Sequence, residues 1–388
     1  MFGPPPLPSP ACGGGKGGGI RVPPLFCHDL LTTLPFTTPP ASLCLLRLSA
    51  LGDICHMLPI VRTIQQVWPQ TKLTWIIGRS EHGLVRDIPD IEFVVLDKAR
   101  GLRAYAELRA RLRARKFDAL LHMQMSLRAS LASLCVSSSV RLGFDRPRAQ
   151  DFQWLFTNHR IAARKREHVQ DSFFGFIEAL GVQQRVLRWD IPVPTGAQAF
   201  AEKMLGAGAP ILVISPCSSM SYRNWHAAGY AAVADYAAQK HGLRVALTGG
   251  PSAIERDYAQ AITAQARCQP IDLIGRTDLK QLLAILARAT AVVAPDSGPA
   301  HMATAVGTPV IGLYACTNPE RARPYLSADY VVNRYPEAIQ AKFGRSVDEM
   351  PWGTRARDAG TMARIAVAEV TTMLDKLMHN SSKDKTTQ

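Results

Sequence analysis

The chain has 388 residues, of which 47% are hydrophobic, and its formal net charge is +14. This length exceeds what one hydrophobic core usually fills, so we expect two domains, and the hydrophobic content suffices for both. The eight cysteines show no paired spacing, which excludes a disulfide-rich scaffold, and no stretch reaches the ~18 uninterrupted apolar residues of a membrane-spanning helix.

Proline and glycine dominate residues 1–41. The run GGGKGGG lacks both the following Ser or Thr and the preceding strand of a phosphate-binding P-loop. Because Pro and Gly interrupt every apolar run, the segment also lacks the hydrophobic core of a secretory signal. We predict that residues 1–41 form a disordered extension.

The first ordered element is an apolar strand over residues 43–48, followed by Ser49-Ala50-Leu51-Gly52-Asp53 and a helix with apolar residues at helical spacing. Asp53 therefore stands at a strand-to-helix turn, at the carboxyl end of a predicted parallel strand. Open α/β sheets bind ligands at such ends. For an Asp considered alone in this place, a helix N-cap is the better interpretation.

Residues 98–116 contain eight basic residues and one acidic residue, mostly on a predicted amphipathic helix. A solvated helix face and nucleic-acid binding both remain open, although the segment lacks interleaved aromatic residues and any recognised nucleic-acid module. An anionic membrane surface also attracts such a segment, at about 1 kcal/mol per basic residue. Judged by position alone, Arg79, Arg128 and Arg141 are candidates for contacts with an acceptor substrate.

A Pro-rich break at residues 190–196 separates the first strand-helix units from a second set. There, a strand at 211–215 leads into a polar loop with Ser218, Ser219 and Arg223, whose hydroxyls and guanidinium suit phosphate oxygens. The strand at 245–248 ends in a glycine-rich turn with Glu255 soon after. In ordinary loops, such serines and arginines are simply solvated.

The stretch TAVVAPDSGPAHMATAVGTPVIGLYACTNP at residues 290–319 indicates a strand, a tight turn, a short helix and a second strand. Asp296, Ser297 and Gly298 form the turn, and His301 lies in the first turn of the helix. Free N–H groups and the positive end of the helix dipole make this a predicted pyrophosphate site. Simple helix capping by Asp296 and Ser297 is the alternative.

Together these motifs resemble glycosyltransferase family 9, the heptosyltransferases of lipopolysaccharide core assembly. LRLSALGDICHMLPIVRTIQ resembles the family's amino-terminal motif, and APDSGPAHMATAVGTPVIGLYACTNPERARPY resembles its carboxy-terminal motif. The resemblance covers residues 43–374, and several motifs in the same order are more specific than any one of them.

The resemblance implies an α/β GT-B fold, in which two Rossmann-like domains face each other across a central cleft. We assign the acceptor-binding domain to residues 42–192 and the nucleotide-sugar-binding domain to residues 193–378. A terminal helix at residues 362–377 is expected to pack back across the first domain. Residues 379–388 are expected to form a flexible tail.

The resemblance also implies roles for the residues that match its motifs. Asp53 would be the general base, and Arg223, where the family usually has Lys, would offset the charge of the leaving diphosphate. The donor-binding residues would be Ser218, Ser219, Glu255, Asp296, Ser297, Gly298 and His301.

The implied reaction is an inverting displacement at an anomeric carbon, in which an acceptor hydroxyl attacks and ADP leaves. Because Arg223 and a helix amino terminus supply positive charge, we expect neither a metal nor a cofactor. The sequence contains no DxD pair and no His/Cys cluster with ligand spacing.

The expected donor is ADP-heptose, and the expected acceptor is Kdo-lipid A or a core that already carries heptose. We expect a cytoplasmic protein bound peripherally to the anionic inner membrane, with no nucleic-acid partner. Three alternatives stay open: the same fold with another donor sugar, a non-hydrolysing sugar-nucleotide epimerase, and a non-catalytic basic protein that binds polyanions.

Overall fold

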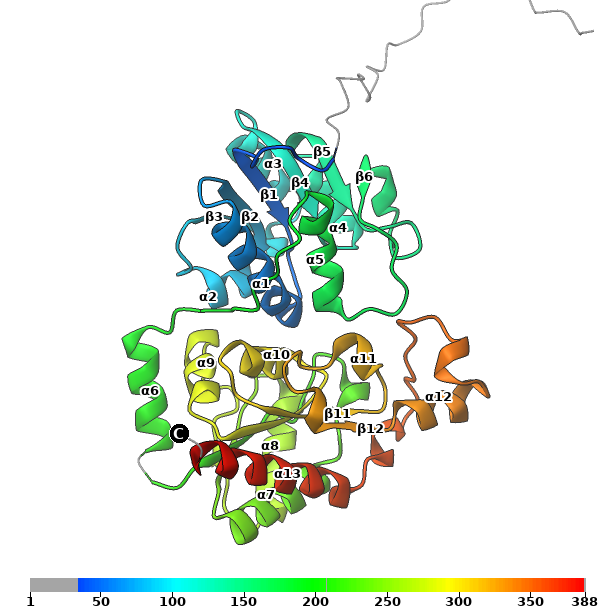
Figure 1. Cartoon of the computed structure of the whole chain (residues 1–388). Helices are drawn as coiled ribbons and strands as arrows, with labels where there is room; N and C mark the ends of the chain where they lie inside the picture. The colour runs from blue at the N-terminus through cyan, green and yellow to red at the C-terminus, as the bar shows by residue number, and fades with distance from the viewer. Residues whose placement is uncertain (1–33, 207, 387–388) are drawn as a thin grey trace, which may run out of the picture.

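The computed structural model describes residues 34–206 and 208–386, which form two α/β domains one above the other (Figure 1). The predicted disorder of residues 1–33 lies outside these residues. Residues 34–41, predicted to be disordered with them, instead pack on the first domain. Phe36 N donates to Leu180 O at 3.1 Å, and Thr71 Oγ1 donates to Pro40 O at 2.6 Å.

The first domain is built on a six-stranded parallel sheet in the order β3-β2-β1-β4-β5-β6. Its strands are β1 (Ser42–Leu46), β2 (Lys72–Gly78), β3 (Ile91–Leu96), β4 (Lys116–His122), β5 (Ser137–Gly143) and β6 (His159–Arg160). Its helices are α1 (Leu51–Val67), α2 (Arg79–Val85), α3 (Leu102–Leu112), α4 (Leu127–Ser133) and α5 (Val169–Ala179).

The second domain repeats this topology with the strand order β12-β11-β10-β7-β8-β9. Its strands are β7 (Ile211–Ile214), β8 (Arg244–Leu247), β9 (Ile271–Asp272), β10 (Ala291–Pro295), β11 (Val310–Tyr314) and β12 (Val331–Asn333). Its helices are α6 (Thr195–Leu205), α7 (Ala227–His241), α8 (Ala253–Gln265), α9 (Leu279–Ala287), α10 (Gly298–Ala305), α11 (Pro319–Ala322), α12 (Tyr335–Phe343) and α13 (Val367–Thr386).

Both sheets have the doubly wound order of a Rossmann fold, so the predicted α/β architecture with two Rossmann-like domains is confirmed. Strand order reverses between β1 and β4 in the first sheet and between β7 and β10 in the second. Ligands bind at such switch points, beyond the carboxyl ends of the strands. The two ends face each other, because α1 of the first domain packs on α10 of the second (Figure 1).

The central strands consist of buried apolar residues, as sheets covered by helices on both faces require. One apolar cluster crosses the domain junction, since it includes Leu58 of α1 and Phe173 of α5 together with Ala300 and Met302 of α10. The helices at the junction are therefore held together by continuous apolar packing. No helix in the described ranges combines the length and the apolar content needed to cross a bilayer.

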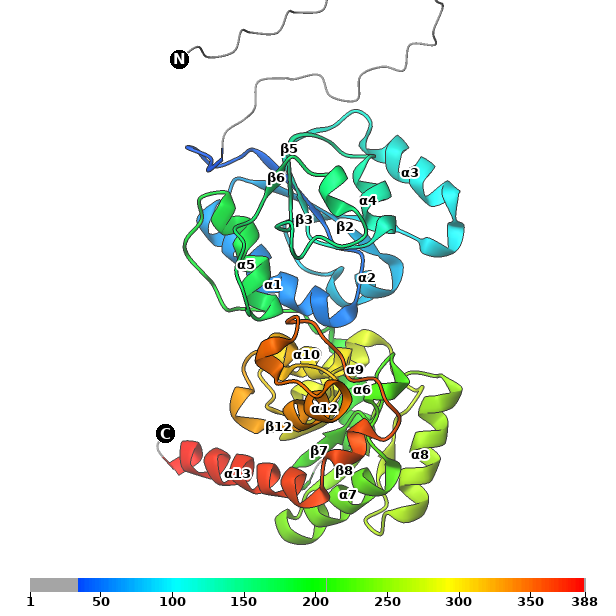
Figure 2. The same ribbon diagram turned by 90° about the vertical axis from the view of Figure 1, so that its right-hand side faces the viewer.

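Helix α13 runs along the second domain, on the side away from the first (Figures 1 and 2). It packs on α7 and β12, and its Val370, Leu374 and Leu377 are buried in the second domain's core. Asp375 accepts a hydrogen bond from Tyr236 Oη at 2.8 Å. The expectation that this helix crosses the first domain was therefore wrong, and the helix continues to Thr386 through most of the expected flexible tail.

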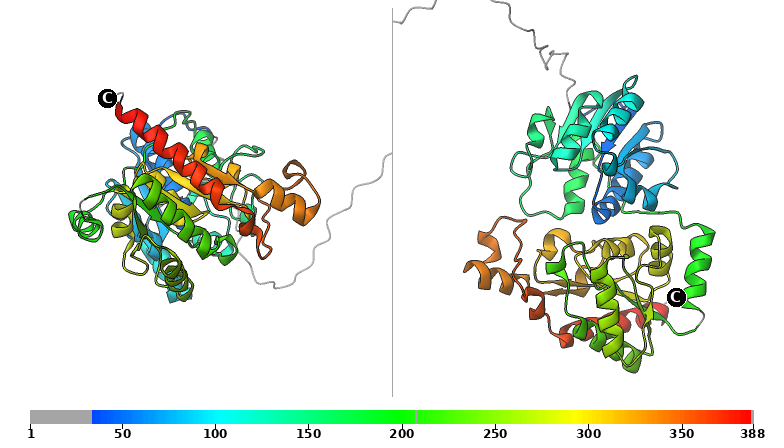
Figure 3. Two further views of the ribbon diagram at one scale, coloured as in Figure 1. Left: turned by 90° about the horizontal axis from the view of Figure 1, so that it is seen from below. Right: turned by 180° about the vertical axis from the view of Figure 1, so that it is seen from behind.

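Two further views show how the chain passes between the domains (Figure 3). The segment after α5 runs along the outside of the junction and enters α6. Arg62 of α1 fixes this connection by donating to Trp189 O at 3.4 Å and to Asp190 O at 2.6 Å. The Trp189 indole donates to Cys55 O at 3.0 Å. The link between the domains is thus anchored on α1, the helix that carries Asp53.

Candidate functional site

The amino termini of α1 and α10 meet at the domain junction, and two glycines allow it. A Cβ atom on Gly52 would lie 2.5 Å from His301 Cδ2, and one on Gly298 would lie 3.0 Å from Leu51 Cδ2. The sequence indicated that these glycines form tight turns. The structure shows that their lack of a side chain permits close approach of the two domains.

Asp53 occupies the third position of α1 rather than its N-cap, and 29% of its side chain is exposed. Its Oδ2 accepts hydrogen bonds from the Arg47 guanidinium and from Ala50 N, the latter at 3.3 Å. Arg47 is itself held by Met123 O, to which Nη1 donates at 2.6 Å. Asp53 is thus an oriented carboxylate that keeps one side open to solvent.

Sequence reasoning missed Arg47, although a charged residue at the end of the apolar strand sequence LCLL was a usable signal. The side chain is 9% exposed, and its Nε lacks a hydrogen-bond partner among the described residues. Charged groups are rarely buried without a partner or a function.

On the opposite side of the junction, Arg223 and Asp296 join the loops that follow β7 and β10. Arg223 Nη1 lies 3.1 Å from Asp296 Oδ2 and 3.1 Å from its backbone oxygen. Burial acts to raise the pKa of Asp296, but His301, Arg223 and Thr317 outweigh it, so the pKa lies below its usual range. Asp296 therefore positions Arg223 and His301, and its own carboxylate is already engaged.

Several buried polar atoms at this junction have no partner within the described part of the chain: Arg47 Nε, Arg223 Nε, Ser297 Oγ and His301 Nδ1. Ser297 is the N-cap residue of α10, yet its side chain makes no capping hydrogen bond. Leaving such an atom unsatisfied costs about 1–3 kcal/mol. We call Arg47, Asp53, Arg223, Asp296, Ser297 and His301 the junction site, whose unpaired donors are available to a polar ligand.

The loop with Ser218 and Ser219 lies beside this site, because η3 (Ser221–Arg223) connects it to Arg223. Ser218 N donates to Asn224 Oδ1 at 2.8 Å, and Ser219 is exposed. Burial, with Glu255 as the second cause, raises the pKa of the neighbouring Cys217 thiol to about 12. The structure thus brings Ser218, Ser219 and Arg223 together and leaves Cys217 protonated at neutral pH.

Glu255 supports the turn after β8. Its Oε1 accepts from Gly250 N and its Oε2 from Ser252 Oγ, both at 2.6 Å. The carboxylate is partly exposed on the side of the Cys217 loop.

The three predicted acceptor arginines have different environments. Arg79 begins α2 and pairs with Asp97 at 2.7 Å, and Arg128 is exposed on α4. Arg141 is half-buried, and its guanidinium nitrogens donate to Phe156 O, Val136 O and Ser133 O at 2.8–2.9 Å. This side chain ties β5 to its surroundings and offers the acceptor no free nitrogen, contrary to the prediction.

A cluster of imidazoles lies behind the junction site. The His56 ring centroid is 4.6 Å from that of His301 and 5.4 Å from that of His168. Burial lowers the pKa of His168 to about 4 and that of His56 well below its usual value, with His301 adding to both shifts. Within the described ranges, no group of three His, Cys, Asp or Glu side chains is arranged to hold a metal ion.

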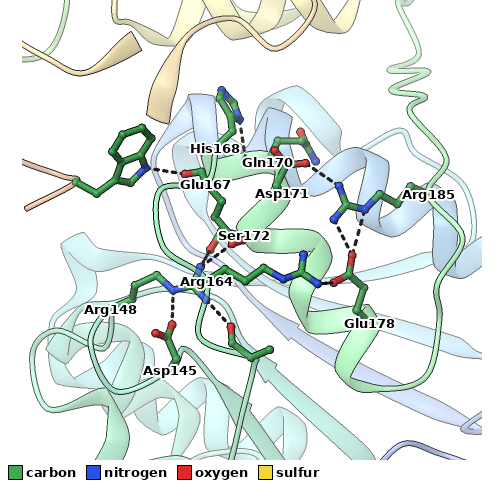
Figure 4. A network of polar contacts seen from close by, with 12 residues as sticks. Asp145, Arg148, Arg164, Glu167, His168, Gln170, Asp171, Ser172, Glu178 and Arg185 are labelled. Atoms are coloured by element: carbon green, nitrogen blue, oxygen red, sulfur yellow. Dashed lines mark hydrogen bonds and ion pairs between the residues drawn. The ribbon is translucent and has the colours of Figure 1, made fainter. Parts of the chain in front are cut away.

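Helix α5 and the residues just before it make a second set of contacts between the domains, beside the polar network of the first domain that Figure 4 shows. His168 Nε2 donates to Arg323 O at 2.9 Å, and Trp352 Nε1 donates to Glu167 O at 2.8 Å. Asp171 Oδ1 accepts from Tyr325 Oη at 3.0 Å. Since His168 Nδ1 accepts from Gln170 N at 3.0 Å, these contacts require the neutral imidazole with its proton on Nε2.

Known proteins resemble this chain over most of its length. The sequence profile of glycosyltransferase family 9 (heptosyltransferase) matches residues 105–352. The lipopolysaccharide core heptosyltransferase OpsX of Haemophilus influenzae is 42% identical over 342 residues, which cover 88% of this chain and 98% of that protein. Lipopolysaccharide heptosyltransferase 3 of Escherichia coli is 24% identical over 342 residues, covering 85% and 97%.

Solved structures give the same fold. A family 9 glycosyltransferase from Veillonella parvula superposes with a TM-score of 0.72 at 20% identity and covers 88% of this chain and 97% of its own. The ADP-heptose lipopolysaccharide heptosyltransferase II of E. coli gives a TM-score of 0.66 at 19% identity, covering 88% and 99%. These likenesses extend over both Rossmann-like domains.

Proposed function

The chain belongs to glycosyltransferase family 9, the heptosyltransferases, and we propose that it transfers heptose from ADP-heptose to the inner core of lipopolysaccharide, with inversion at the anomeric carbon. One observation carries the proposal. A carboxylate held by Arg47 faces, across the domain junction, a set of buried donors without partners. This arrangement suits a reaction that needs a base on one side and stabilisation of a leaving anion on the other.

Asp53 is the general base in this proposal. It takes the proton of an acceptor hydroxyl as that oxygen bonds to the anomeric carbon of heptose. The bond from that carbon to the diphosphate oxygen breaks on the opposite face, and its electron pair leaves with ADP. A base in this role contributes about 10²–10⁴-fold to the rate. Arg47 keeps the carboxylate aimed at the junction through its own bond to Met123 O.

The second domain stabilises the leaving diphosphate. Arg223 Nε, Ser297 Oγ and the first N–H groups of α10 are donors for its oxygens, and Ser218 and Ser219 add hydroxyls from the neighbouring loop. Asp296 fixes Arg223 in place. Because a guanidinium remains charged at any physiological pH, this contribution does not vary with proton concentration. Glu255 is the candidate for the ribose hydroxyls.

The acceptor in this proposal is Kdo-lipid A or a heptosylated core, presented at the cytoplasmic face of the inner membrane. Exposed arginines of α3 and α4, such as Arg103, Arg109 and Arg128, provide the positive charge that anionic lipids attract. Beside them lies an apolar face whose side chains are 42–65% exposed: Leu127, Leu131, Leu134, Phe152 and Leu155.

Two hydrogen bonds join the segments that carry these apolar and basic side chains. Tyr105 Oη of α3 donates to Arg128 O at 3.5 Å, and Leu127 N donates to Asp151 Oδ2 at 3.4 Å. Apolar side chains with basic neighbours suit the interface of an anionic bilayer. Vesicle sedimentation tests the proposed membrane binding. The protein should bind vesicles that contain phosphatidylglycerol and should not bind vesicles of phosphatidylcholine alone. Leu131→Asp should weaken binding to the phosphatidylglycerol vesicles.

The test of the activity is ADP release by the purified protein given ADP-heptose, with and without Kdo-lipid A that lacks heptose, followed by mass spectrometry of the lipid. A heptose-sized gain on the lipid supports the donor, the acceptor and the reaction together. Release only with an already heptosylated acceptor makes the enzyme one that adds a later sugar. Donor turnover without any acceptor, giving an isomer of the donor, contradicts the proposal in favour of an epimerase.

A further inference from the structure

The unpaired donors of the junction site are enclosed in this conformation. Four of these atoms are buried: Arg47 Nε, Arg223 Nε, Ser297 Oγ and His301 Nδ1. The first turn of α10 is in contact with α1 of the other domain, since a Cβ atom on Gly298 would lie 3.0 Å from Leu51 Cδ2. A ligand therefore reaches these donors only when the two domains move apart.

The covalent link between the domains lies on one side of this contact, where the segment between α5 and α6 passes along the left of Figure 1. Lys280 of α9 donates to Pro192 O of this segment at 2.6 Å and pairs with Asp87 of the first domain at 3.0 Å. The Lys280 side chain is only 4% exposed. Because Arg62 fixes the same segment from α1, this side of the junction is suited to act as the pivot of a domain movement.

On the side away from the link, residues 166–171 of the first domain contact three segments of the second through polar groups. Figure 4 shows Glu167, His168 and Asp171 at this contact. We call the residues of this contact the latch. Its hydrogen-bonded pairs are Tyr325 with Asp171, His168 with Arg323, Trp352 with Glu167, and Arg166 with Asp348.

The latch consists of contacts that water can replace. The side chains of Arg166 and Asp348 are 44% and 80% exposed, and exposed ion pairs contribute little to stability. The net contribution of each neutral hydrogen bond is also modest, because water offers the same groups new partners. The contact of α1 with α10 lies between the pivot and the latch (Figure 1). A rotation about the pivot that separates α1 from α10 must therefore break the latch.

We propose that the structure is the closed conformation of the enzyme and that the latch controls entry to the junction site. A ligand enters when the latch pairs break and the domains rotate apart about the segment between α5 and α6. The latch pairs form again when the domains close over the ligand. The inference goes beyond the proposed reaction, since any ligand of the buried donors must pass the same contacts.

Two conservative changes weaken the latch without leaving a charge unpaired. Tyr325→Phe removes only the hydroxyl, and Asp171 stays paired with Arg185 at 2.7 Å. Trp352→Phe removes the indole N–H that Glu167 O accepts. The matched control is Tyr236→Phe, because the Tyr236 hydroxyl donates to Asp375 at 2.8 Å within the second domain.

The experiment compares wild type, Tyr325→Phe, Trp352→Phe, their double variant and Tyr236→Phe. Stopped-flow fluorescence with a methylanthraniloyl derivative of ADP gives the association rate constant. Hydrogen exchange of the first turn of α10, followed by mass spectrometry without ligand, reports opening independently, because these N–H groups have no partner within the helix. Thermal unfolding of each protein records any general loss of stability.

We expect each single variant to raise the association rate constant and the exchange rate about 2- to 10-fold, as loss of one hydrogen bond raises the open fraction by that factor. In the double variant the two factors should multiply. Tyr236→Phe should match wild type in both rates, even if its midpoint of thermal unfolding falls as far as that of Tyr325→Phe.

Unchanged rates of association and exchange in the double variant would overturn the inference and would assign these contacts to stability alone. An equal rise in Tyr236→Phe would also overturn it, since that change lies outside the latch. If wild type does not bind the ADP derivative, the proposed donor fails. Hydrogen exchange needs no ligand and still decides whether the latch controls opening, so the two failures are distinguishable.

Discussion

The turn after β1 and the turn after β10 both lie at the switch point of a doubly wound sheet, although β10 corresponds to β4 of the first sheet, and their carboxylates have different partners. Within the described residues Asp53 forms an ion pair with Arg47 alone, and its side chain is 29% exposed. The Asp296 side chain is 12% exposed and is engaged by Arg223, His301 and Thr317. Position in a doubly wound fold brings a carboxylate to the ligand edge, and its immediate partners decide whether it can accept a proton or only hold a cation.

The largest expected effect is that of Asp53→Asn. Asn keeps an oxygen for Arg47 but is no base, so kcat should fall by about 10²–10⁴-fold. ADP affinity should change little, because the second domain is untouched, whereas the midpoint of thermal unfolding should fall, because the Arg47 side chain is 9% exposed and loses its counter-charge. Transfer assays and calorimetry measure these quantities. An unchanged kcat would remove Asp53 from the role of base.

Asp296→Asn should mainly lower stability and ADP affinity. Removing one member of a buried pair leaves Arg223 without its counter-charge, which typically costs about 3–5 kcal/mol of stability. Urea unfolding should record that loss, and ADP affinity should fall because Arg223 is no longer held. If Asp296→Asn lowers kcat while stability and ADP affinity are kept, the contrast between the two carboxylates is mistaken.

The close approach of the two turns can be tested at Gly52. In Gly52→Ala the new methyl group would lie 2.5 Å from His301 Cδ2, so the buried His301 ring or the two helices must shift, at a cost of about 1–3 kcal/mol. We expect lower stability and lower kcat together. Gly83→Ala is the matched control at another contact between the domains, since its methyl group would meet only Leu279 Cδ1 at 3.8 Å.

The smallest effect concerns the pH dependence of stability. His168 has a pKa of about 4 in the fold and 6.5 as a free group, so the unfolded chain takes up the proton first. The stabilisation by neutral His168 is complete above pH 6.5 and is lost as the pH falls from 6.5 towards 4. His56 acts in the same direction.

Replacing His168 with Asn keeps an acceptor for Gln170 N and removes the titration. Between pH 7 and pH 5 the wild-type free energy of unfolding should fall by up to about 2 kcal/mol more than that of His168→Asn. Denaturant curves at the two pH values give this difference. If the free energy of unfolding falls by the same amount in both proteins between pH 7 and pH 5, His168 is not buried as a neutral group.

The sequence by itself determined the alternation of strands and helices, the two-domain architecture and the strand-to-helix turns that carry Asp53 and Asp296. These follow from apolar periodicity and turn residues that are local in the chain. The wrong expectation that the last helix crosses the first domain came from the family resemblance, and the packing of α13 on α7 and β12 depends on residues far apart in the sequence.

Only the tertiary structure decided which of those polar residues are free. Arg141 was predicted to be available from its position, but its guanidinium donates to three backbone oxygens, whereas Arg47 was not predicted and holds Asp53. Gly52 and Gly298 serve the contact between the domains rather than their own turns. Hydrogen bonding, burial and charge balance depend on groups far apart in the sequence, and they exist only once the two sheets face each other.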